Sequence, residues 1–380
     1  MPPLTEHSIT LNLTLPKAVD KKMEVFYNSV MASHRNIAIL LLNSLPNTKM
    51  NIADPLAGSG IRSLRFLKEL KKGKINHLFI NDMKANFPQN FKNSDRLNNI
   101  KNKNISLFNE DASLFLLNQV NNKKKPKNFC GYFDYIDIDP FGSPNSFLDA
   151  AIARICRHGV LGITATDTAA LTGTYEKVTR RKYWAQPLRN YLMHEMGLRI
   201  LIRKIQLQGI QFEKASTPIL SYSKDHYYRI YLQVERGKEK CDELVKQHQY
   251  FLFCHACLNF KTSIFNREKC SCGKEFVFAG PLWVGNLGDA SLLTTMVKNN
   301  LFQQEQKLLD VLQREYQKNK VGFYDAHILA KKYKHDPPKL DQLLQKLDAV
   351  RTHFSPTGIK TEGTLKEVMR ALGKRQFHNL

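Results

Sequence analysis

The chain has 380 residues, 42% of them hydrophobic, and 57 Lys and Arg against 34 Asp and Glu give a formal net charge of +23. This length predicts about two domains, and no apolar run approaches the roughly 20 residues that a membrane span needs. The proline-containing start does not match a secretory signal, so we expect a cytosolic protein with no membrane partner and no evident obligate protein partner. The positive charge suits a polyanion such as RNA, although DNA-binding, membrane-surface and thermophilic proteins are also basic.

The first predicted strand, residues 50–53, leads into a glycine-rich turn and the start of a helix. The strand is followed by Asp54, and Gly58 and Gly60 precede Arg62. Glycines in such a turn let the backbone approach a nucleotide-like cofactor closely. A lone Gly-x-Gly pair is weak evidence, so this interpretation depends on the rest of the chain.

An acidic residue closely follows each of four short apolar runs. They are Asp54, Asp82, Asp111 and Asp139, at intervals of 28, 29 and 28 residues. A strand with its crossover helix takes about 30 residues, so the pattern predicts parallel strands whose carboxyl ends place the carboxylates on one rim. Chance placement of acids in a polar chain is the alternative.

The fourth of these strands, residues 132–138, runs directly into Asp139-Pro140-Phe141. Open α/β sheets bind ligands at the carboxyl ends of their strands, where this motif offers a hydrogen-bond acceptor, a rigid turn and a ring. A flat base with an exocyclic amine suits these groups. Asp-Pro after a strand is also an ordinary turn signal.

Two clusters of basic residues flank that motif. Four lysines fall within residues 123–127, in a polar segment, and residues 180–184 combine two arginines and a lysine with Tyr183 and Trp184. Cations beside aromatic rings are typical of proteins that bind single-stranded or looped RNA. A solvated helix face gives a similar pattern, which we favour for the lysine run.

Three later segments, residues 158–166, 216–222 and 228–234, continue the predicted sheet, the last two as an antiparallel hairpin that closes it. A polar stretch, residues 236–240, follows. We therefore predict two domains, residues 1–240 and 241–380.

Four of the seven cysteines form two close pairs, Cys254-x-x-Cys257 and Cys270-Ser271-Cys272, separated by twelve residues. This is the ribbon spacing of a tetrahedral Zn²⁺ site. Four thiolates leave no position for water, so the ion would be structural. Metal-free reduced pairs or a disulfide are the alternatives.

The remaining chain predicts a helix over residues 301–317, two short helices over 325–332 and 339–347, and a hairpin over 350–360. This is the order of a winged helix, whose second helix and hairpin contact nucleic acid. A plain helical packing module would show the same periodicity.

Together these motifs resemble the tRNA guanine-26 N2-dimethyltransferases, class I enzymes that use S-adenosyl-L-methionine. The matching segments are Phe26-Tyr27-Asn28, Arg35, residues 54–62, Asn81-Asp82, Glu110-Asp111-Ala112 and residues 139–144. The last segment is the most specific. The chain departs from the family pattern at Ser29, where a proline is expected, and at His34-Arg35-Asn36, where Asn-Arg-Asp is expected.

The resemblance implies a cofactor site that also includes Asp54, Gly58 and Gly60. Asp82 would accept hydrogen bonds from the ribose hydroxyls. Asp111 would bind the adenine amino group, and the backbone N–H of Ala112 would face the adenine ring. Arg35 and Arg62 would hold the methionine carboxylate.

For the substrate, the resemblance implies that guanine stacks between Phe26 and Phe141. Asp139 and the carbonyl of Pro140 would accept the two N–H bonds of its N2 amine, which then receives one or two methyl groups. Phe26 also lies in an apolar stretch, residues 25–42, that fits the buried face of a helix.

The expected fold class is α/β, with a Rossmann-like class I methyltransferase sheet joined to a smaller, zinc-containing α+β C-terminal domain. The expected function is methylation of guanine 26 in tRNA. Two alternatives remain open: methylation of another exocyclic amine, in ribosomal RNA guanine or DNA adenine, and a catalytically silent RNA-binding protein with this fold.

Overall fold

The computed structural model describes residues 4–12, 25–101, 104–122, 126, 128–336 and 339–373. Its central sheet has seven strands: β3 (Met50–Asp54), β4 (Ile75–Asn81), β5 (Ile105–Phe108), β6 (Phe133–Ile138), β7 (Ile155–Ala165), β8 (Lys214–Lys224) and β9 (Tyr227–Arg236). They lie in the order β5-β4-β3-β6-β7-β9-β8. The first five are parallel, as the spacing of the acidic residues predicts.

The predicted hairpin is confirmed, and it determines how the sheet ends. β9 pairs antiparallel with both β7 and β8, so β8 again runs in the direction of the first five strands. The side chains of β6 explain why the sheet lies in the interior of the protein. Its side chains at Phe133, Tyr135, Ile136 and Ile138 are all buried, because helices cover both faces of the sheet.

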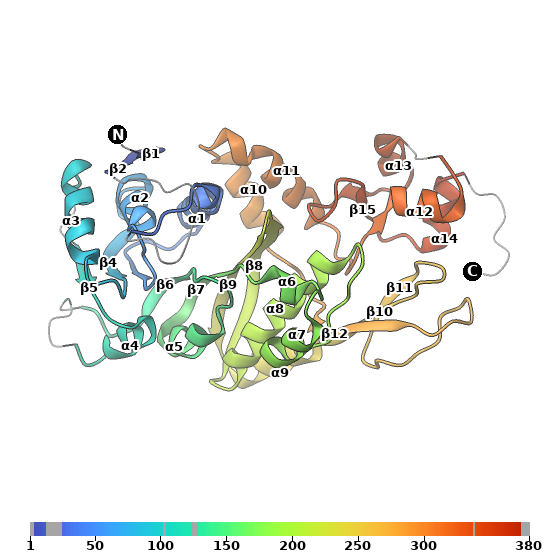
Figure 1. The fold of residues 1–380 in the computed structure, drawn as a ribbon, viewed down its shortest axis with the longest axis horizontal. Helices are drawn as coiled ribbons and strands as arrows, with labels where there is room; N and C mark the ends of the chain where they lie inside the picture. Colours follow the sequence, from blue (N-terminus) through green and yellow to red (C-terminus); the bar gives the residue numbers. More distant parts are fainter. Residues whose placement is uncertain are drawn as a thin grey trace.

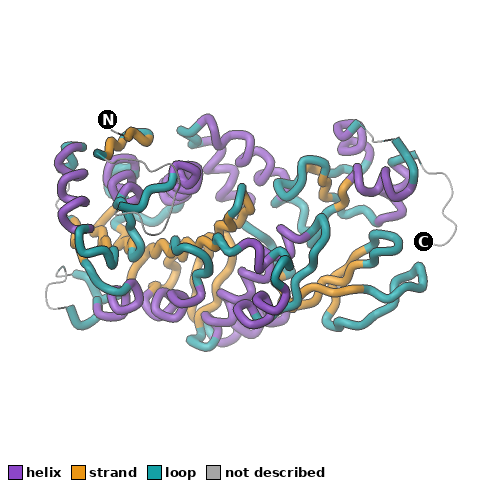
Figure 2. The backbone as a smooth tube through the Cα atoms, in the orientation of Figure 1, coloured by secondary structure: helices purple, strands orange, loops and turns teal. Residues whose placement is uncertain are grey.

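Helices form a layer on each side of the sheet (Figure 1). One layer holds α1 (Ala32–Ser44), α2 (Ile61–Glu69), α3 (Phe87–Leu97), α10 (Ala290–Lys298) and α11 (Gln306–Glu315). The other holds α4 (Ala112–Asn118), α5 (Leu148–Arg154), α8 (Met193–Ile210) and α9 (Lys238–Lys246), with α6 (Thr168–Leu171) and α7 (Glu176–Tyr183) after β7. Figure 2 shows the strands as a band between these layers.

α1 is apolar on every side over residues 37–42, which are all buried. It packs against the sheet on one side and against α10 and α11 on the other, where Leu293 and Leu312 join the same core. A helix buried all round has this composition. Phe26, however, lies ahead of α1 and of the short 3-10 helix η1 (Ser29–Met31), so the helix-face interpretation of Phe26 is wrong.

The C-terminal part contains two small sheets. β10 (His248–Phe253) lies between β11 (Phe260–Ser263) and β12 (Val277–Trp283), and β15 (Gly358–Lys360) lies between β13 (Tyr324–Asp325) and β14 (Val350–Arg351). Helices α12 (Ala326–Tyr333), α13 (Leu340–Lys346) and α14 (Leu365–Ala371) cover the second. Two short helices followed by a hairpin match the predicted order. Their use in nucleic-acid binding stays a prediction.

The two parts of the chain share their hydrophobic cores. Leu293 and Leu312 pack with α1, and Phe251 and Leu329 belong to the core that contains α8. The predicted helix over residues 301–317 is shorter than expected, because the 3-10 helix η3 (Gln303–Glu305) precedes α11. A short hairpin, β1 (Leu4–Glu6) and β2 (Ile9–Leu11), packs near α2 and α3. The division at residue 240 stays a prediction.

In the described part of the chain, none of the helices is long and apolar enough to cross a bilayer.

Candidate active site at the carboxyl ends of the strands

The glycine turn after β3 adopts a conformation that needs glycine. Gly58 has φ 58° and Gly60 has φ 74°, both in the left-handed region. A Cβ at Gly60 would lie 2.4 Å from Cδ2 of Phe91, and one at Gly58 would lie 3.2 Å from the carbonyl oxygen of Phe26. The segment before α1 therefore lies directly on the predicted cofactor turn.

Asp82, after β4, is fixed against this turn. Its Oδ2 accepts a hydrogen bond from the N–H of Gly58 at 2.8 Å, and its Oδ1 accepts one from the N–H of Lys84 at 3.0 Å. The buried side chain of Asn81 joins three loops, since it bonds the carbonyl of Pro55 and both the N–H and the carbonyl of Glu110. The ends of β3, β4 and β5 are thus held together.

Asp111 caps the amino terminus of α4. Its Oδ1 accepts hydrogen bonds from the N–H groups of Ser113 and Leu114, at 2.8 and 3.0 Å. Ala112 is the first residue of α4, where a backbone N–H has no partner within its own helix. Both groups lie at the predicted rim and are suited to hydrogen-bond a purine edge.

Asp139, after β6, uses only one of its carboxylate oxygens. Oδ2 accepts a hydrogen bond from Nη2 of Arg62, and the side chain is 18% exposed. Among the described residues, no group donates a hydrogen bond to Oδ1 or to the carbonyl oxygen of Pro140. Two acceptors are therefore available side by side at the end of this strand.

Behind Asp139 lies a buried charge network that the sequence analysis did not identify. Nη1 of Arg62 is 3.3 Å from Oδ2 of Asp137, and Arg229 donates to both oxygens of Asp137 at 3.2 and 2.6 Å. Tyr135 donates a further hydrogen bond to Asp137. An aspartate between two isoleucines in a fully buried strand is the signal that could have revealed it.

The network shifts the pKa values of its members. Burial would lower the pKa of Arg62, but the carboxylates of Asp137 and Asp139 outweigh it and raise that pKa. Burial raises the pKa of Asp54 to about 7, and the negative charges of Asp137 and Asp139 add to this effect against Arg62 and a hydrogen bond from Ser63. Asp54 thus differs from Asp137, because burial raises its pKa while the neighbouring arginines lower that of Asp137.

Phe26 and Phe141 contact each other. Their ring centroids are 4.4 Å apart with an interplanar angle of 71°, and the Phe141 side chain is about half exposed. Edge-to-face packing of this kind leaves no room for a third ring between them. Stacking of guanine between the two rings therefore requires the rings to separate.

Arg35 is bound by Glu6 and by the carbonyl of Asn28. Its Nε donates to Oε1 of Glu6 at 2.7 Å, and its Nη2 donates to the carbonyl of Asn28 at 3.1 Å. Burial would raise the pKa of Glu6, but the hydrogen bond from Arg35 and the charges of Arg35 and Arg65 lower it. The two predicted partners of the methionine carboxylate, Arg35 and Arg62, thus both bind carboxylates of the protein.

α7 carries the basic residues of the second cluster and is attached to the loop after Asp139. The hydroxyl of Tyr183 bonds Asp167 at 2.6 Å and Ser143 at 3.0 Å, and Asn145 donates to the carbonyl of Lys182. Tyr183 is buried, so the expectation that it offers a stacking ring is wrong. Trp184 is exposed, with Nζ of Lys204 3.1 Å from its ring centroid. The lysine run at residues 123–127 lies outside the described residues, except for Pro126.

The four paired cysteines form a compact cluster. The Sγ atoms of Cys254, Cys257, Cys270 and Cys272 all lie within 4.8 Å of one another, with two pairs at 3.5 Å. Thiolates about 2.3 Å from a tetrahedral Zn²⁺ lie about 3.8 Å apart, so the cluster fits this ion. The distances are far longer than a disulfide bond. The hydroxyl of Tyr333 donates to the carbonyl of Cys257, which ties the cluster to α12.

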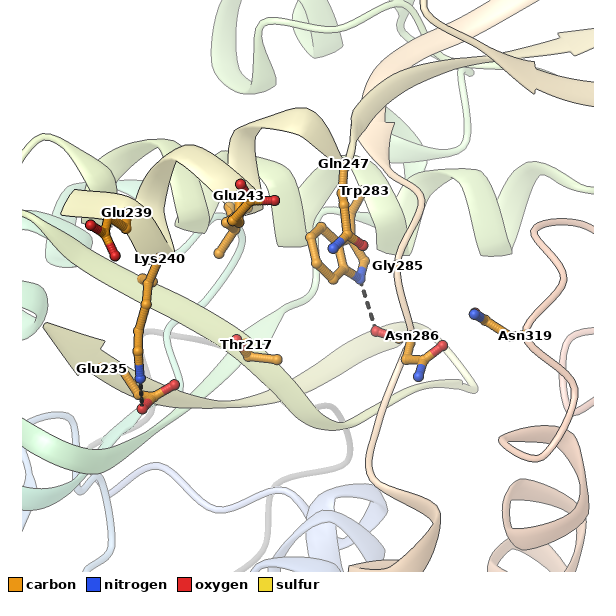
Figure 3. A pocket seen from close by; sticks show the side chains of 12 residues that line it. Thr217, Glu235, Glu239, Lys240, Glu243, Gln247, Trp283, Gly285, Asn286 and Asn319 are labelled. Carbon is orange, nitrogen blue, oxygen red and sulfur yellow. Dashed lines mark hydrogen bonds and ion pairs between the residues drawn. The ribbon is translucent and has the colours of Figure 1, made fainter. Parts of the chain in front are cut away.

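A cavity of about 640 Å³ is lined by residues of β8, α9 and β12 (Figure 3). Its lining includes Thr217 near the start of β8 and Glu235 near the end of the antiparallel β9. These residues mark the amino ends of the parallel strands, whereas Asp139 lies at the carboxyl end. An ion pair between Lys240 and Glu235 spans one side of the cavity.

Comparisons with known proteins agree with this geometry. The profile of the family described as N2,N2-dimethylguanosine tRNA methyltransferase matches residues 5–373. A tRNA (guanine(26)-N(2))-dimethyltransferase of Methanocaldococcus jannaschii is 37% identical over 384 residues, covering 97% of this chain and 98% of that protein. A tRNA (guanine(26)-N(2)/guanine(27)-N(2))-dimethyltransferase of Aquifex aeolicus is 36% identical, covering 94% and 92%.

A solved structure shows the same fold over the full length. Trm1 from Pyrococcus horikoshii, in complex with S-adenosyl-L-methionine, superposes with a TM-score of 0.83 at 30% identity. The match covers 98% of this chain and 99% of that one. The two proteins therefore share one architecture, which includes the sheet, the helical layers and the C-terminal region.

Proposed function

The chain belongs to the N2,N2-dimethylguanosine tRNA methyltransferase family, and we propose that Asp139 and the Pro140 carbonyl orient the amine that its reaction methylates. As a member, it is an S-adenosyl-L-methionine-dependent tRNA (guanine-26)-N2-dimethyltransferase. The single observation that carries the proposal is the state of Asp139, in which Arg62 binds one carboxylate oxygen and the other oxygen accepts no hydrogen bond from the described residues.

The guanine N2 lone pair is delocalised into the ring, so the free amine is a poor nucleophile. Hydrogen bonds from its two N–H groups to Oδ1 of Asp139 and to the Pro140 carbonyl would direct the lone pair away from both acceptors. The bound cofactor supplies an electrophilic methyl group on sulfur. The new N–C bond would form as the bond between this methyl carbon and sulfur breaks, which leaves a neutral thioether and a positive nitrogen, and Oδ1 of Asp139 would accept the proton that the nitrogen then loses. Alignment of the reacting atoms supplies much of the acceleration.

For the cofactor, we propose the set that the sequence predicts at the ends of β3, β4 and β5. Each oxygen of Asp82 accepts one backbone hydrogen bond and keeps lone pairs for ribose hydroxyls. Asp111 uses Oδ1 for its cap, which leaves Oδ2 for the adenine amine. A carboxylate-binding role for Arg35 has less support, because Glu6 already binds its guanidinium.

For the metal, the four clustered cysteines would hold a structural Zn²⁺ that stabilises the C-terminal region and takes no part in methyl transfer.

For tRNA, we propose that the exposed side of α7, with Arg181 and Trp184, contacts the backbone beside guanine 26. The hydrogen bond between Tyr183 of α7 and Ser143 supports this proposal, because it attaches the helix to the loop that follows Asp139. Phe141 would stack the base, with Phe26 moving to admit it. A cytosolic location and action without an obligate partner protein remain expectations.

The decisive experiment uses a full-length tRNA transcript with guanine at position 26, digested to nucleosides after reaction and analysed by mass. We expect N2-methylguanosine early and N2,N2-dimethylguanosine at completion. A matched transcript with adenine 26 should yield neither. Modified adenosine in the second transcript, or equal methylation of a short stem-loop, would favour action on another exocyclic amine. Because the Aquifex relative is named for guanine 27 as well, the digest should also separate positions 26 and 27.

A further inference from the structure

The side chain of His34 lies at the centre of the site. It is the third residue of α1 and is fully buried. Nδ1 lies 3.1 Å from Nη2 of Arg62 and 3.7 Å from Oδ2 of Asp139, while Nε2 lies 3.0 Å from Oγ1 of Thr164. One imidazole thus joins α1, α2, β7 and the loop that carries Asp139.

The partners fix the protonation of this ring. Arg62 can only donate, so Nδ1 must accept its hydrogen bond and the ring proton must be on Nε2, which donates to Thr164. Burial, together with the charges of Arg229, Arg62 and Arg35, lowers the pKa of His34 far below its usual value. A charged ring would direct an N–H against the guanidinium of Arg62. The imidazole is therefore a neutral acceptor.

The contact with His34 involves the same nitrogen of Arg62 that binds Asp139. Nη2 of Arg62 donates to both Nδ1 of His34 and Oδ2 of Asp139, while Nη1 faces Asp137. A guanidinium is planar and rigid, so an acceptor on one side of Nη2 fixes the direction in which its other N–H points. The orientation of the Asp139 carboxylate thereby depends on His34.

We propose that His34 is a positioning residue for methyl transfer, which holds Arg62 against Oδ2 of Asp139 so that Oδ1 stays directed at the substrate amine. The inference rests on the proposed role of Asp139. Asparagine offers an acceptor oxygen at the position of Nδ1, so His34→Asn should keep the contact with Arg62 while losing the one with Thr164.

The test compares His34→Leu, His34→Asn and His34→Gln in single-turnover and steady-state methylation of full-length tRNA. Leucine removes both contacts, and glutamine lacks an acceptor at the δ position. We expect kcat to fall about 10- to 100-fold in the leucine and glutamine variants, as misplacement of a reacting group does. KM for the cofactor and for tRNA should stay within about twofold, and His34→Asn should keep kcat within about threefold of the parent.

His248→Leu is the matched control. His248 is partly buried, and burial lowers its pKa to about 4, so it is neutral as well; its Nε2 is hydrogen-bonded to Gln206 at 2.9 Å, but it lies in β10. The His248→Leu variant should have a lower thermal stability and an unchanged kcat. Equal kcat for the asparagine and glutamine variants, whatever the stability of the leucine variant, would overturn the role of His34. If kcat is unaffected by these changes while Asp139→Asn is inactive, only this inference fails; activity in Asp139→Asn would remove the proposed function itself.

Discussion

Nζ of Lys360 in β15 lies 3.1 Å from Oε1 of Glu195 in α8, and both side chains are almost completely buried. Lys360 also lies 3.2 Å from Glu315, whose other oxygen accepts a hydrogen bond from Nδ1 of His353 at 2.6 Å. Nε2 of His353 in turn accepts the backbone N–H of Ser223 at the edge of β8. A continuous chain of buried polar contacts therefore connects the C-terminal region to the central sheet.

Lys360→Met should be strongly destabilising. It leaves the carboxylates of Glu195 and Glu315 buried with one partner fewer, and breaking a buried ion pair in this way costs about 3–5 kcal/mol. Denaturant unfolding monitored by tryptophan fluorescence measures the loss. Lys318→Met is the control, because Lys318 pairs with Asp348 at 2.6 Å where the aspartate is 94% exposed. Equal midpoints for the two variants would show that the buried contacts are energetically neutral.

Asp139→Asn should separate chemistry from binding. We expect cofactor affinity, measured by calorimetry, to change by less than about threefold, and kcat to fall about 100- to 10,000-fold, as loss of a positioned acid–base group does. Asp82→Ala should do the reverse and weaken cofactor binding first, since it removes the acceptor of the Gly58 N–H. Turnover of Asp139→Asn near that of the parent would exclude this carboxylate as the proton acceptor.

Metal analysis of protein purified without chelator should find about one zinc per chain, because structural-site binding energy is folding energy. Cys254→Ser and Cys272→Ser should lower metal content and melting temperature together. Cys156→Ser is the control, since its thiol lies in β7 outside the cluster. Full metal content in either cluster variant would contradict the four-thiolate site.

The pH dependence of stability should reveal the raised pKa of Asp54. Its folded pKa of about 7 lies above the unfolded value, so the folded protein binds this proton more tightly. The resulting stabilisation is complete below about pH 4 and is lost as the pH rises through 7. Asp54→Asn should therefore raise the melting temperature at pH 8 by roughly 2 °C or more relative to the parent. At pH 5 the difference should shrink; a constant difference at both pH values would show that Asp54 titrates normally. Asp348→Asn, at an exposed site, serves as the control.

Arg181→Ala should weaken tRNA binding through charge. Arg181 is exposed on α7 and has no ion-pair partner among the described residues. Loss of one phosphate contact should reduce the slope of log affinity against log salt by about one. Filter binding across a salt series measures this slope, with Lys238→Ala, at the start of α9 after β9, as the control. A slope equal to that of the parent would place tRNA elsewhere.

Much of the fold followed from local patterns. Short apolar runs ending near Asp54, Asp82, Asp111 and Asp139 predicted parallel strands, and the structure has those strands in one sheet. The cysteine spacing predicted a cluster that the structure brings within 4.8 Å. Both are properties of segments shorter than about 30 residues, in which chain geometry alone relates spacing to position.

The tertiary structure decided which polar groups surround the reactive carboxylate. Arg229 reaches Asp137 from 92 residues away, Arg62 binds Asp139 from 77 residues away, and His34 meets Thr164 from 130 residues away. Burial of these groups is costly unless each finds its partners, and no local pattern encodes which distant side chain will do so. The sequence by itself determined the strands, the rim and the cysteine cluster; only the packing of α1, α2 and β9 around β6 determined the environment of Asp139, because buried charges are paired across elements and not along the chain.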